Sequence, residues 1–283
     1  VSQMIKNTFL FALNVKRHVF NELLNAVKTL REQGIEVSAE SWIHNFVREE
    51  LGVALSDRIA DADFILSLGG DGTLLRAAQL AIKHNKPLLG VNAGRLGFLT
   101  EFDLSQLRDY LGDIKENHYH IEDRSLISIR INDKDYHVVN DVVISRGGYS
   151  RLVNFDVYCD QQFVSSYFAD GLVLSTPTGS TGYSLSAGGP IMMPDVESFV
   201  ITPICAHSLL HRSIVVSNDK HLEVRLKNDT DLKSQLILDG ITVKSLSKNE
   251  SIRVCKSDRV LKLIRFSNRN FFEIVQKKLI EWK

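Results

Sequence analysis

The chain has 283 residues, of which 44% are hydrophobic and 24% are charged, a composition typical of a globular protein with one large domain or two of ordinary size. Its 34 basic and 34 acidic residues cancel, which argues against a strongly electrostatic binder of nucleic acid or of a membrane surface. No apolar run approaches the roughly 20 residues that a membrane-spanning helix needs, so we expect neither nucleic acid nor a membrane as a partner.

The three cysteines argue for a reducing setting. Cys159, Cys205 and Cys255 are odd in number and widely spaced, and the sequence has no Cys-x-x-Cys pair. This pattern supports neither a disulfide framework nor a thiolate metal site. The short apolar run near Val1 lacks the small-residue cleavage site of a signal peptide, so we expect a cytoplasmic protein.

The first hundred residues alternate between strand and helix patterns. Apolar runs predict strands at residues 8–13, 35–37, 60–68 and 86–91, and apolar residues at helical spacing predict helices at 19–30 and 74–82. Strands that alternate with helices indicate a parallel sheet with right-handed crossovers.

After residue 101 the sequence becomes rich in short strands. A helix is expected at 104–110, and Ile127, Ile129 and Ile131 alternate with polar residues as in a half-buried strand. Further strands are expected at 138–145, 152–158, 162–168, 171–175, 215–216, 222–226, 236–238, 242–246 and 252–255. Frequent turns between short strands predict an antiparallel sandwich, and a last helix is expected at 271–282.

These patterns predict two domains. The first is an α/β domain with a parallel sheet, formed by residues 1–100 and completed by about residues 266–283. The second is an all-β, sandwich-like domain formed by residues 101–265, after which the C-terminal helix returns to the first domain.

A glycine turn stands between a predicted strand and a predicted helix. Gly69-Gly70-Asp71-Gly72-Thr73 follows the apolar run 62–68, and unpaired N–H groups at a helix N-terminus bind anions such as phosphate. A carboxylate is unusual beside a phosphate. Asp71 could accept a proton from an attacking hydroxyl, hold Mg²⁺, or do both, or it could simply cap the helix in a tight turn. The next predicted strand also ends in a polar loop with glycines, residues 92–100, and ligands bind at such strand ends.

A second dense stretch, residues 176–190, carries six Ser and Thr hydroxyls, Tyr183 and four glycines. Hydroxyls and open backbone amides suit polyol and phosphate groups, and Tyr183 could stack on a ring; the alternative is a solvated loop.

Asn140-Asp141 interrupts the expected apolar strand 138–145. The pair could read a nucleobase edge or ribose hydroxyls, or it could mark an edge bulge.

Other short patterns favour structure over chemistry. Asp239-Gly240 between two apolar runs is a strong hairpin signal, and Asp170-Gly171 alone predicts an ordinary turn. His207 and His211 are four residues apart but have no evident third metal ligand. The sequence has no Gly-Lys-Ser/Thr phosphate loop, no G-x-G-x-x-G and no G-x-S-x-G. The residues alone therefore predict a phosphate-handling α/β domain beside a β-rich domain, without fixing the reaction.

Taken together and in this order, four segments resemble the NAD kinases, the bacterial type in particular. They are Gly69-Gly70-Asp71-Gly72-Thr73, Asn92-x-Gly94-x-Leu96-Gly97-Phe98-Leu99, Asn140-Asp141-Val142-Val143 and the stretch from Thr176 to Pro190. A later segment, Pro203 to Leu209 with Arg212, is similar to another stretch of that family. A lone Gly-Gly-Asp-Gly also occurs in diacylglycerol kinases and phosphofructokinases, whereas the second and fourth segments are far more specific.

The resemblance implies an activity and its residues. NAD kinases transfer the terminal phosphoryl of ATP, or in some members of polyphosphate, to the 2′-hydroxyl of the adenosine ribose of NAD, with Mg²⁺ as cofactor. Asp71 would accept the hydroxyl proton, and the family forms homodimers and homotetramers, across whose interface Asp170 could reach NAD. The NAD-binding residues would be Asp71, Gly72, Phe98, Asn140, Asp141, Arg151, Asp170, Thr178, Thr181, Gly182, Tyr183, Ser184, Leu185, Ser186 and Ala206. The phosphate-binding residues would be Gly69, Gly70, Gly72, Thr73, Asn92 and Gly94.

Three positions depart from the family pattern: Gly182 stands in place of a common Ala, Ala206 in place of Pro, and Ile241 in place of a Gln that contacts NAD.

Two other functions compete with the kinase. A lipid or sphingoid kinase that shares Gly-Gly-Asp-Gly needs an apolar substrate cavity, which the hydroxyl-rich stretch argues against. A non-catalytic dinucleotide sensor gains little from Asp71 near phosphates.

Overall fold

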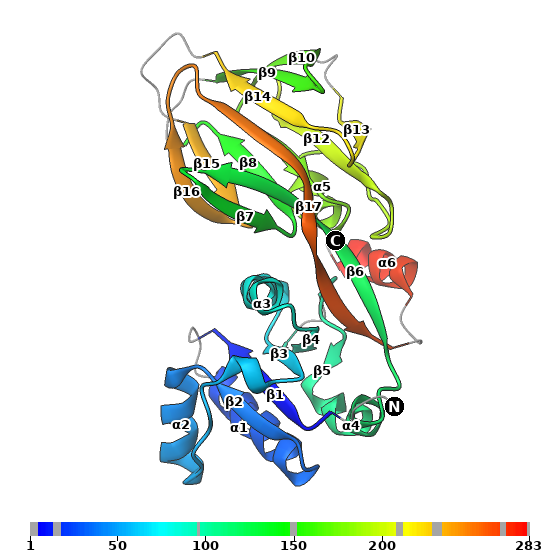
Figure 1. Cartoon of the computed structure of the whole chain (residues 1–283). Helices are drawn as coiled ribbons and strands as arrows, with labels where there is room; N and C mark the ends of the chain where they lie inside the picture. The colour runs from blue at the N-terminus through cyan, green and yellow to red at the C-terminus, as the bar shows by residue number, and fades with distance from the viewer. Residues whose placement is uncertain are drawn as a thin grey trace. The chain divides into compact units, whose positions relative to one another are not determined.

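The chain forms two units, Val1–Asp123 with Leu261–Lys283, and Arg124–Val260 (Figure 1). The computed structural model describes residues 5–13, 18–94, 97–147, 152–207, 212–227, 234–266 and 270–281. The first unit reaches Asp123, beyond the expected boundary at residue 100, because strand β5 (Phe102–Asp103) pairs with β4 and helix α4 (Leu107–Lys115) packs on α1.

The first unit is built on a parallel sheet, as the sequence predicts. Strands β1 (Asn7–Ala12), β2 (Glu36–Ala39), β3 (Phe64–Leu68) and β4 (Leu88–Asn92) lie in the order β4-β3-β1-β2. All residues of β3 and β4 are buried, as expected for central strands of a covered parallel sheet. The helices of this unit are α1 (His18–Glu32), α2 (Ser41–Leu51), α3 (Asp71–His84), α4 and α6 (Phe271–Glu281), with short 3₁₀ turns η1 (Ile59–Asp61) and η2 (Leu104–Gln106).

One apolar cluster joins this sheet to its helices. Leu10, Leu66 and Leu89 of the strands pack with Leu23 of α1 and Ile43 of α2. Helix α3 packs against β3 and β4 without joining that cluster. The packed sheet therefore fixes the positions at which the glycine-bearing loops begin.

The second unit is an antiparallel β sandwich, again as the sequence predicts. One sheet has the order β13-β12-β11-β8-β15-β16, and the other contains β10-β9-β14-β17, with β6 and β7 paired to each other and β6 to β17. The inner faces meet in one apolar cluster that includes Ile129, Phe155, Leu172 and Val224. The strands are β6 (His120–Ile131), β7 (Lys134–Val138), β8 (Asp141–Ser145), β9 (Val153–Cys159), β10 (Gln162–Ala169), β11 (Gly171–Ser175), β12 (Ser198–Ile204), β13 (Ile214–Ser217), β14 (Leu222–Leu226), β15 (Ser234–Leu238), β16 (Ile241–Leu246) and β17 (Ser251–Arg265), with the short turns η3 (Thr178–Thr181) and α5 (Tyr183–Ser186). Strand β6 begins, and strand β17 ends, in the first unit.

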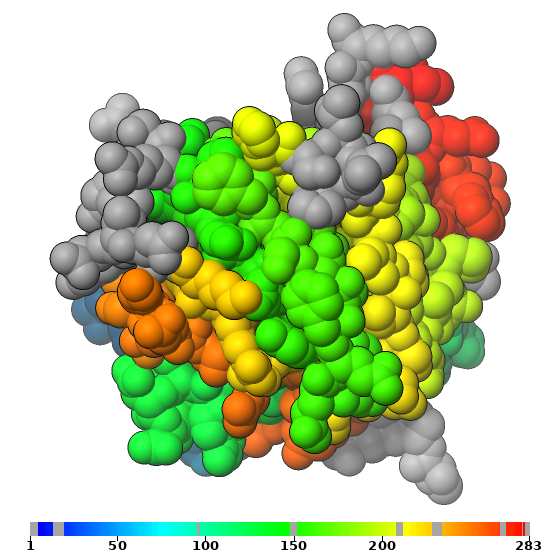
Figure 2. All heavy atoms as spheres, turned by 90° about the horizontal axis from the view of Figure 1, so that it is seen from above, coloured from blue at the N-terminus to red at the C-terminus, as the bar shows by residue number. Residues whose placement is uncertain are grey.

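Figure 2 shows the face on which the hairpin β9–β10, in green, reaches the surface. Its edge strand β10 exposes Phe163 and Phe168, which are 59% and 48% accessible. Among the described residues, every helix is too short or too polar to cross a membrane.

The expected strand 138–145 is confirmed at Asp141–Ser145, which is β8, but its start is wrong. The chain leaves β7 at Val138 and enters β8 at Asp141, and these two strands belong to different sheets. The change is possible because the Asp239 carboxylate accepts the N–H groups of Val139 and Asn140, which therefore need no strand partner. The helix α2 and the strand β12 are absent from the sequence predictions. Strand β17 is longer than the expected 252–255, because the consecutive charged residues Asp258 and Arg259 interrupt the alternation of apolar and polar residues that predicts a strand.

Candidate functional site

The turn after β3 requires glycine at its first position. Gly69 has a φ of 151°, which L side chains rarely adopt, and a Cβ there would lie 2.4 Å from Thr73 Oγ1. Gly70 is the N-cap of α3 and makes no side-chain capping bond, and Asp71 is the first helical residue. The alternative in which Asp71 caps the helix is therefore wrong. Beside Gly70 and Gly72 there is open space, since no atom lies within 4 Å of where a Cβ would be.

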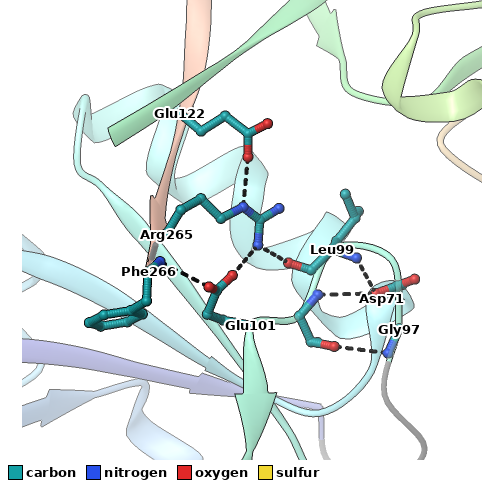
Figure 3. A network of polar contacts seen from close by, with 8 residues as sticks. Asp71, Gly97, Leu99, Glu101, Glu122, Arg265 and Phe266 are labelled. Atoms are coloured by element: carbon teal, nitrogen blue, oxygen red, sulfur yellow. Dashed lines mark hydrogen bonds and ion pairs between the residues drawn. The ribbon is translucent and has the colours of Figure 1, made fainter. Parts of the chain in front are cut away.

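The Asp71 carboxylate binds the loop that follows β4 (Figure 3). Its Oδ2 accepts the N–H of Phe98 at 2.8 Å, and its Oδ1 accepts the N–H groups of Leu99 at 2.9 Å and Thr100 at 3.4 Å. Gly97 makes this approach possible, because a Cβ at that position would lie only 2.0 Å from Asp71 Oδ1. The two glycine-bearing loops that the sequence singles out are thus joined through one carboxylate.

The Asp71 carboxylate can accept a hydrogen bond beyond those that it makes to the loop. A carboxylate has about four acceptor positions, and the three amides occupy three of them. The helix N-terminus also favours the negative charge. Asp71 is therefore a half-exposed carboxylate in a fixed orientation that can accept one more hydrogen bond or proton.

Asn92 lies at the same end of the sheet, but its side chain makes hydrogen bonds within the protein. Its Nδ2 donates to Gly94 O at 2.7 Å and to Asp103 Oδ1 at 2.8 Å, and its side chain is buried. These bonds shape the loop and tie it to β5. Arg95 and Leu96 of the same loop lie outside the described residues.

A second cluster forms in the other unit around Asn140 and Asp141. A Cβ at Gly182 would lie 3.7 Å from Asn140 Nδ2 and 4.0 Å from Asp141 Oδ2, so this glycine faces both side chains. A Cβ at Gly179 would lie 2.2 Å from Asn140 O, which shows how closely η3 presses on the 139–140 backbone. The Thr176 N–H donates to the same oxygen at 2.9 Å. The structure thus brings together two segments that the sequence treats separately.

The two polar side chains of this cluster are unusual for buried groups. Burial, reinforced by the nearby Asp239 charge, raises the pKa of Asp141 to about 7. Asn140 Oδ1 is buried without a hydrogen-bond partner among the described residues. An acceptor without a partner and a carboxyl near half-protonation can bind the hydroxyls or amino group of a nucleoside.

The stretch 176–190 is not a solvated loop, so that alternative is wrong. Residues 176–180 are all buried, and most hydroxyls are used internally. Thr176 Oγ1 donates to Val139 O at 2.6 Å, Ser180 Oγ to Pro177 O at 2.6 Å, and Ser184 Oγ bonds Thr202 Oγ1 at 3.0 Å. Thr178 Oγ1 accepts from Arg124 Nη1 at 3.3 Å, and Thr181 Oγ1 donates to Thr178 O at 3.2 Å. Tyr183 and Ser186 are exposed, whereas Leu185 is half-buried.

Asp170 lies apart from this cluster within the chain. It precedes β11, where Gly171 pairs with Ser145, while Asp141 pairs with Ser175 at the other end of the same two strands. Its carboxylate lies 3.1 Å from Arg146 Nη1. Ala206 is half-buried beside the sandwich core. Arg151 and His211 lie outside the described residues.

The sequence predictions miss two groups that hold these clusters. Asp239 was expected only to turn a hairpin, which it does, since Leu238 pairs with Ile241. An Asp-Gly turn carries no further signal, so its bonds to the 139–140 backbone were not foreseen. The buried pair Glu101–Arg265 is also unforeseen, because its members lie 164 positions apart and neither stands in a recognisable pattern.

Two family models match the chain: the ATP-NAD kinase N-terminal domain over residues 2–119 and the ATP-NAD kinase C-terminal domain over residues 139–266. The NAD kinase of Thermoanaerobacter sp. (strain X514) is 37% identical over 91% of this chain and 94% of its own length. The NAD kinase of Magnetococcus marinus is 43% identical over 77% of this chain and 73% of its own length, and that of Legionella pneumophila (strain Corby) is 35% identical over 99% and 97%.

Solved structures have the same fold. The yeast NADH kinase complexed with NADH superposes with a TM-score of 0.87 over 98% of this chain and 88% of that chain, at 23% identity. An NAD kinase from Archaeoglobus fulgidus in complex with ATP superposes with a TM-score of 0.76 over 96% and 98%, at 25% identity. The family models and the curated relatives agree, and the chain belongs to the NAD kinase family.

Proposed function

We propose that this chain transfers the terminal phosphoryl of ATP to the 2′-hydroxyl of the adenosine ribose of NAD, which gives NADP, ADP and a proton. The observation that carries the proposal is the Asp71 carboxylate, which the amides of Phe98, Leu99 and Thr100 hold at a glycine-lined helix N-terminus. A phosphate site needs such N–H groups, and an attacking hydroxyl needs an acceptor for its proton.

In the first unit, Asp71 would orient the 2′-hydroxyl and accept its proton at the open position of its carboxylate. The N–H groups of Gly70 and Gly72 would bind phosphate, because the space beside both glycines is open. Gly69 and Thr73 would shape the turn, since their N–H groups bond Val91 O and Gly70 O. Asn92 and Gly94 would hold the neighbouring loop, and Phe98 would contact NAD.

In the second unit, Asn140 and Asp141 would bind the polar groups of a nucleoside of NAD, with Gly182 leaving room beside them. Tyr183 and Ser186, both exposed, would contact the dinucleotide directly. Thr178, Thr181, Ser184 and Leu185 would contribute mainly by shaping the turn, because three of their hydroxyls are used within the protein. Arg151 and Ala206 complete the proposed set, and Asp170 would act on NAD bound by another copy.

The donor groups fit a magnesium ion that is held mainly by ATP. Among the described residues no three His, Cys, Asp or Glu side chains come close enough to form a metal site. Mg²⁺ is commonly bound by one or two carboxylates together with substrate phosphates, and Asp71 is the carboxylate at the phosphate turn. When bound, the ion would neutralise charge on the transferred phosphoryl group.

Two further features belong to the proposal. We place the enzyme in the cytoplasm, where its three free cysteines would stay reduced. We also propose a homodimer or homotetramer, supported by the exposed Phe163 and Phe168 on the edge strand β10.

The test is NADP formation from Mg-ATP and NAD by the wild type and by Asp71→Asn, with NAD binding measured by calorimetry. The variant should bind NAD and lose about 10²-fold or more in kcat, the usual contribution of a general base. Asp61→Asn, an exposed carboxylate of the same unit, is the matched control and should keep full activity. If the wild type binds NAD but forms no NADP with ATP or polyphosphate, the chain is a dinucleotide sensor and the proposal is wrong.

A further inference from the structure

The peptide group between Leu99 and Thr100 is held from both sides within the first unit (Figure 3). On one side, the N–H of Thr100 donates to Asp71 Oδ1 at 3.4 Å, beside the shorter bond from the N–H of Leu99. On the other side, the carbonyl of Leu99 accepts a bond of 2.9 Å from Arg265 Nη1. A single peptide group therefore separates the guanidinium of Arg265 from the carboxylate of Asp71.

Arg265 is itself fixed by two carboxylates. Its Nη1 lies 2.7 Å from Glu101 Oε2, and its Nε lies 2.7 Å from Glu122 Oε2. The side chains of Arg265 and Glu101 are only 4% and 2% exposed. The other oxygen of Glu101 accepts the N–H of Phe266 at 3.0 Å. Glu101 therefore binds both the last residue of β17, Arg265, and the residue that follows it.

Glu101 also belongs to the loop that holds Asp71. Its N–H donates to Gly90 O at 2.7 Å, and it follows directly after Thr100, whose Oγ1 accepts the N–H of Gly97 at 3.0 Å. The short segment 97–101 is therefore tied to three places: to Asp71 on α3, to Gly90 on β4 and to Arg265 on β17. Of these three ties, only Arg265 brings a charge from a segment more than 160 positions away.

Stability alone does not account for this arrangement. Removing two charges from water costs about as much as their attraction returns, and replacing a buried ion pair by apolar residues of similar volume is often neutral or stabilising. Arg265 also buries its Nη2 without a partner among the described residues, which adds to the cost. What a planar guanidinium with several directed bonds provides is a fixed position for its acceptors.

We propose that Arg265, held by Glu101, is a positioning residue for phosphoryl transfer. Through the 99–100 peptide group it sets the orientation of the amides that fix the Asp71 carboxylate, and its charge strengthens the Thr100 N–H as a donor to that carboxylate. Because its side chain is buried, Arg265 would act through the loop and not by contact with a substrate. The inference rests on the proposed role of Asp71.

The experiment compares four variants with the wild type for kcat and KM with Mg-ATP and NAD, well below each melting temperature. Arg265→Met should lower kcat by about 10²-fold, as expected for a reacting group displaced by about 1 Å, with both KM values changed less than about threefold. Arg265→Lys keeps the charge and one donor direction, so it should recover part of the loss. Glu101→Gln keeps the shape of the side chain and should lose less than Arg265→Met.

Lys227→Met is the matched control, because it removes the cation from another buried carboxylate, Asp156, in the second unit. It should lower the melting temperature without lowering kcat more than about twofold. If Arg265→Met and Lys227→Met both keep kcat, or both lose it equally, the pair Glu101–Arg265 is only structural and the inference is wrong. If Arg265→Met does not fold, Arg265→Lys and Glu101→Gln decide, and failure of all three to fold also rejects a positioning role.

A double-mutant comparison separates this inference from the proposed function. In an Asp71→Asn background, Arg265→Met should lower kcat less than about threefold further, because the loop then has no carboxylate to position. An undiminished further loss would show that Arg265 acts elsewhere. If Asp71→Asn alone keeps wild-type activity, the proposed function of Asp71 fails instead. Amide exchange at Phe98, Leu99 and Thr100, faster in Arg265→Met than in Lys227→Met, tests the positioning step without any turnover.

Discussion

The carboxylate of Asp239 lies 2.7 Å from the backbone nitrogen of Asn140, although the two residues are 99 positions apart. Its other oxygen accepts the N–H of Val139 at 2.9 Å. The hairpin turn between β15 and β16 thus fixes the point where the chain passes from one sheet of the sandwich to the other. That point also carries two proposed NAD-binding side chains, so stability and substrate binding depend on the same contact.

We predict that Asp239→Ala lowers both. The backbone N–H groups of Val139, Asn140 and Asp141 lose a charged acceptor, which costs about 1.5–3 kcal/mol for the strongest of the three bonds. Urea unfolding should show this loss, and calorimetry should show weaker NAD binding because Asn140 and Asp141 are less well placed. Asp160→Asn is a suitable comparison, since Asp160 also accepts a backbone N–H, from His221, in an exposed turn of the same unit. Equal NAD affinity in wild type and Asp239→Ala would contradict the expectation.

Asp141 should make the stability of the protein depend on pH between about 4 and 7. Burial and the Asp239 charge raise its pKa to about 7, above the ordinary value of 3.8. A carboxyl whose pKa is raised on folding contributes stability that is fully present below pH 3.8 and is lost as the pH rises through 7. The whole difference corresponds to about 4 kcal/mol, which is an upper value for a single group.

The measurement is the free energy of unfolding at several pH values from 4 to 8 for wild type and Asp141→Asn. The difference between the two proteins isolates this carboxyl from the other titrating groups. The stability of Asp141→Asn relative to wild type should increase over that range, because Asn stays neutral while Asp141 becomes a buried charge. Parallel curves would show that the Asp141 pKa is not raised.

Elements that depend on neighbouring residues could be predicted from this sequence, whereas contacts between distant segments could not. Local patterns predicted elements such as β14 with its observed bounds 222–226, and the hairpin β9–β10 to within one residue. They also predicted where the glycine-bearing loops lie, because glycines and polar residues after an apolar strand are local features. The start of the expected strand 138–145 is wrong because the bonds that interrupt it at residues 139–140 come from Asp239, far along the chain. Likewise, no local pattern could show that Arg265 holds Leu99, since that contact exists only after the sheet has formed.

Gly97→Ala should reduce catalysis more than stability. Its Cβ would lie 2.0 Å from Asp71 Oδ1, so the carboxylate must leave its position between the loop amides. We expect kcat to fall by about 10²-fold, the effect of a small displacement of a reacting group. Gly112→Ala is the control, because a Cβ on that face of helix α4 meets nothing within 4 Å and should stabilise the helix by about 0.5–1 kcal/mol. Steady-state kinetics and thermal unfolding of both variants test this, and an unchanged kcat in Gly97→Ala would contradict it.

Gly179 and Gly182 lie three positions apart around η3, yet they should respond differently to the same substitution. A Cβ at Gly179 would meet Asn140 backbone atoms at 2.2, 2.5 and 2.7 Å, and backbone cannot move aside cheaply. Gly179→Ala should therefore separate η3 from the 139–140 turn, destabilise the second unit by about 1–3 kcal/mol and raise the KM for NAD. At Gly182 the nearest contact would be Gly179 O at 3.3 Å, followed by Asn140 Nδ2 at 3.7 Å, so Gly182→Ala needs only a small adjustment. Thermal unfolding and the KM for NAD of the two variants, measured side by side, should differ clearly. Similar losses in both would mean that the contact between η3 and Asn140 does not control the NAD site.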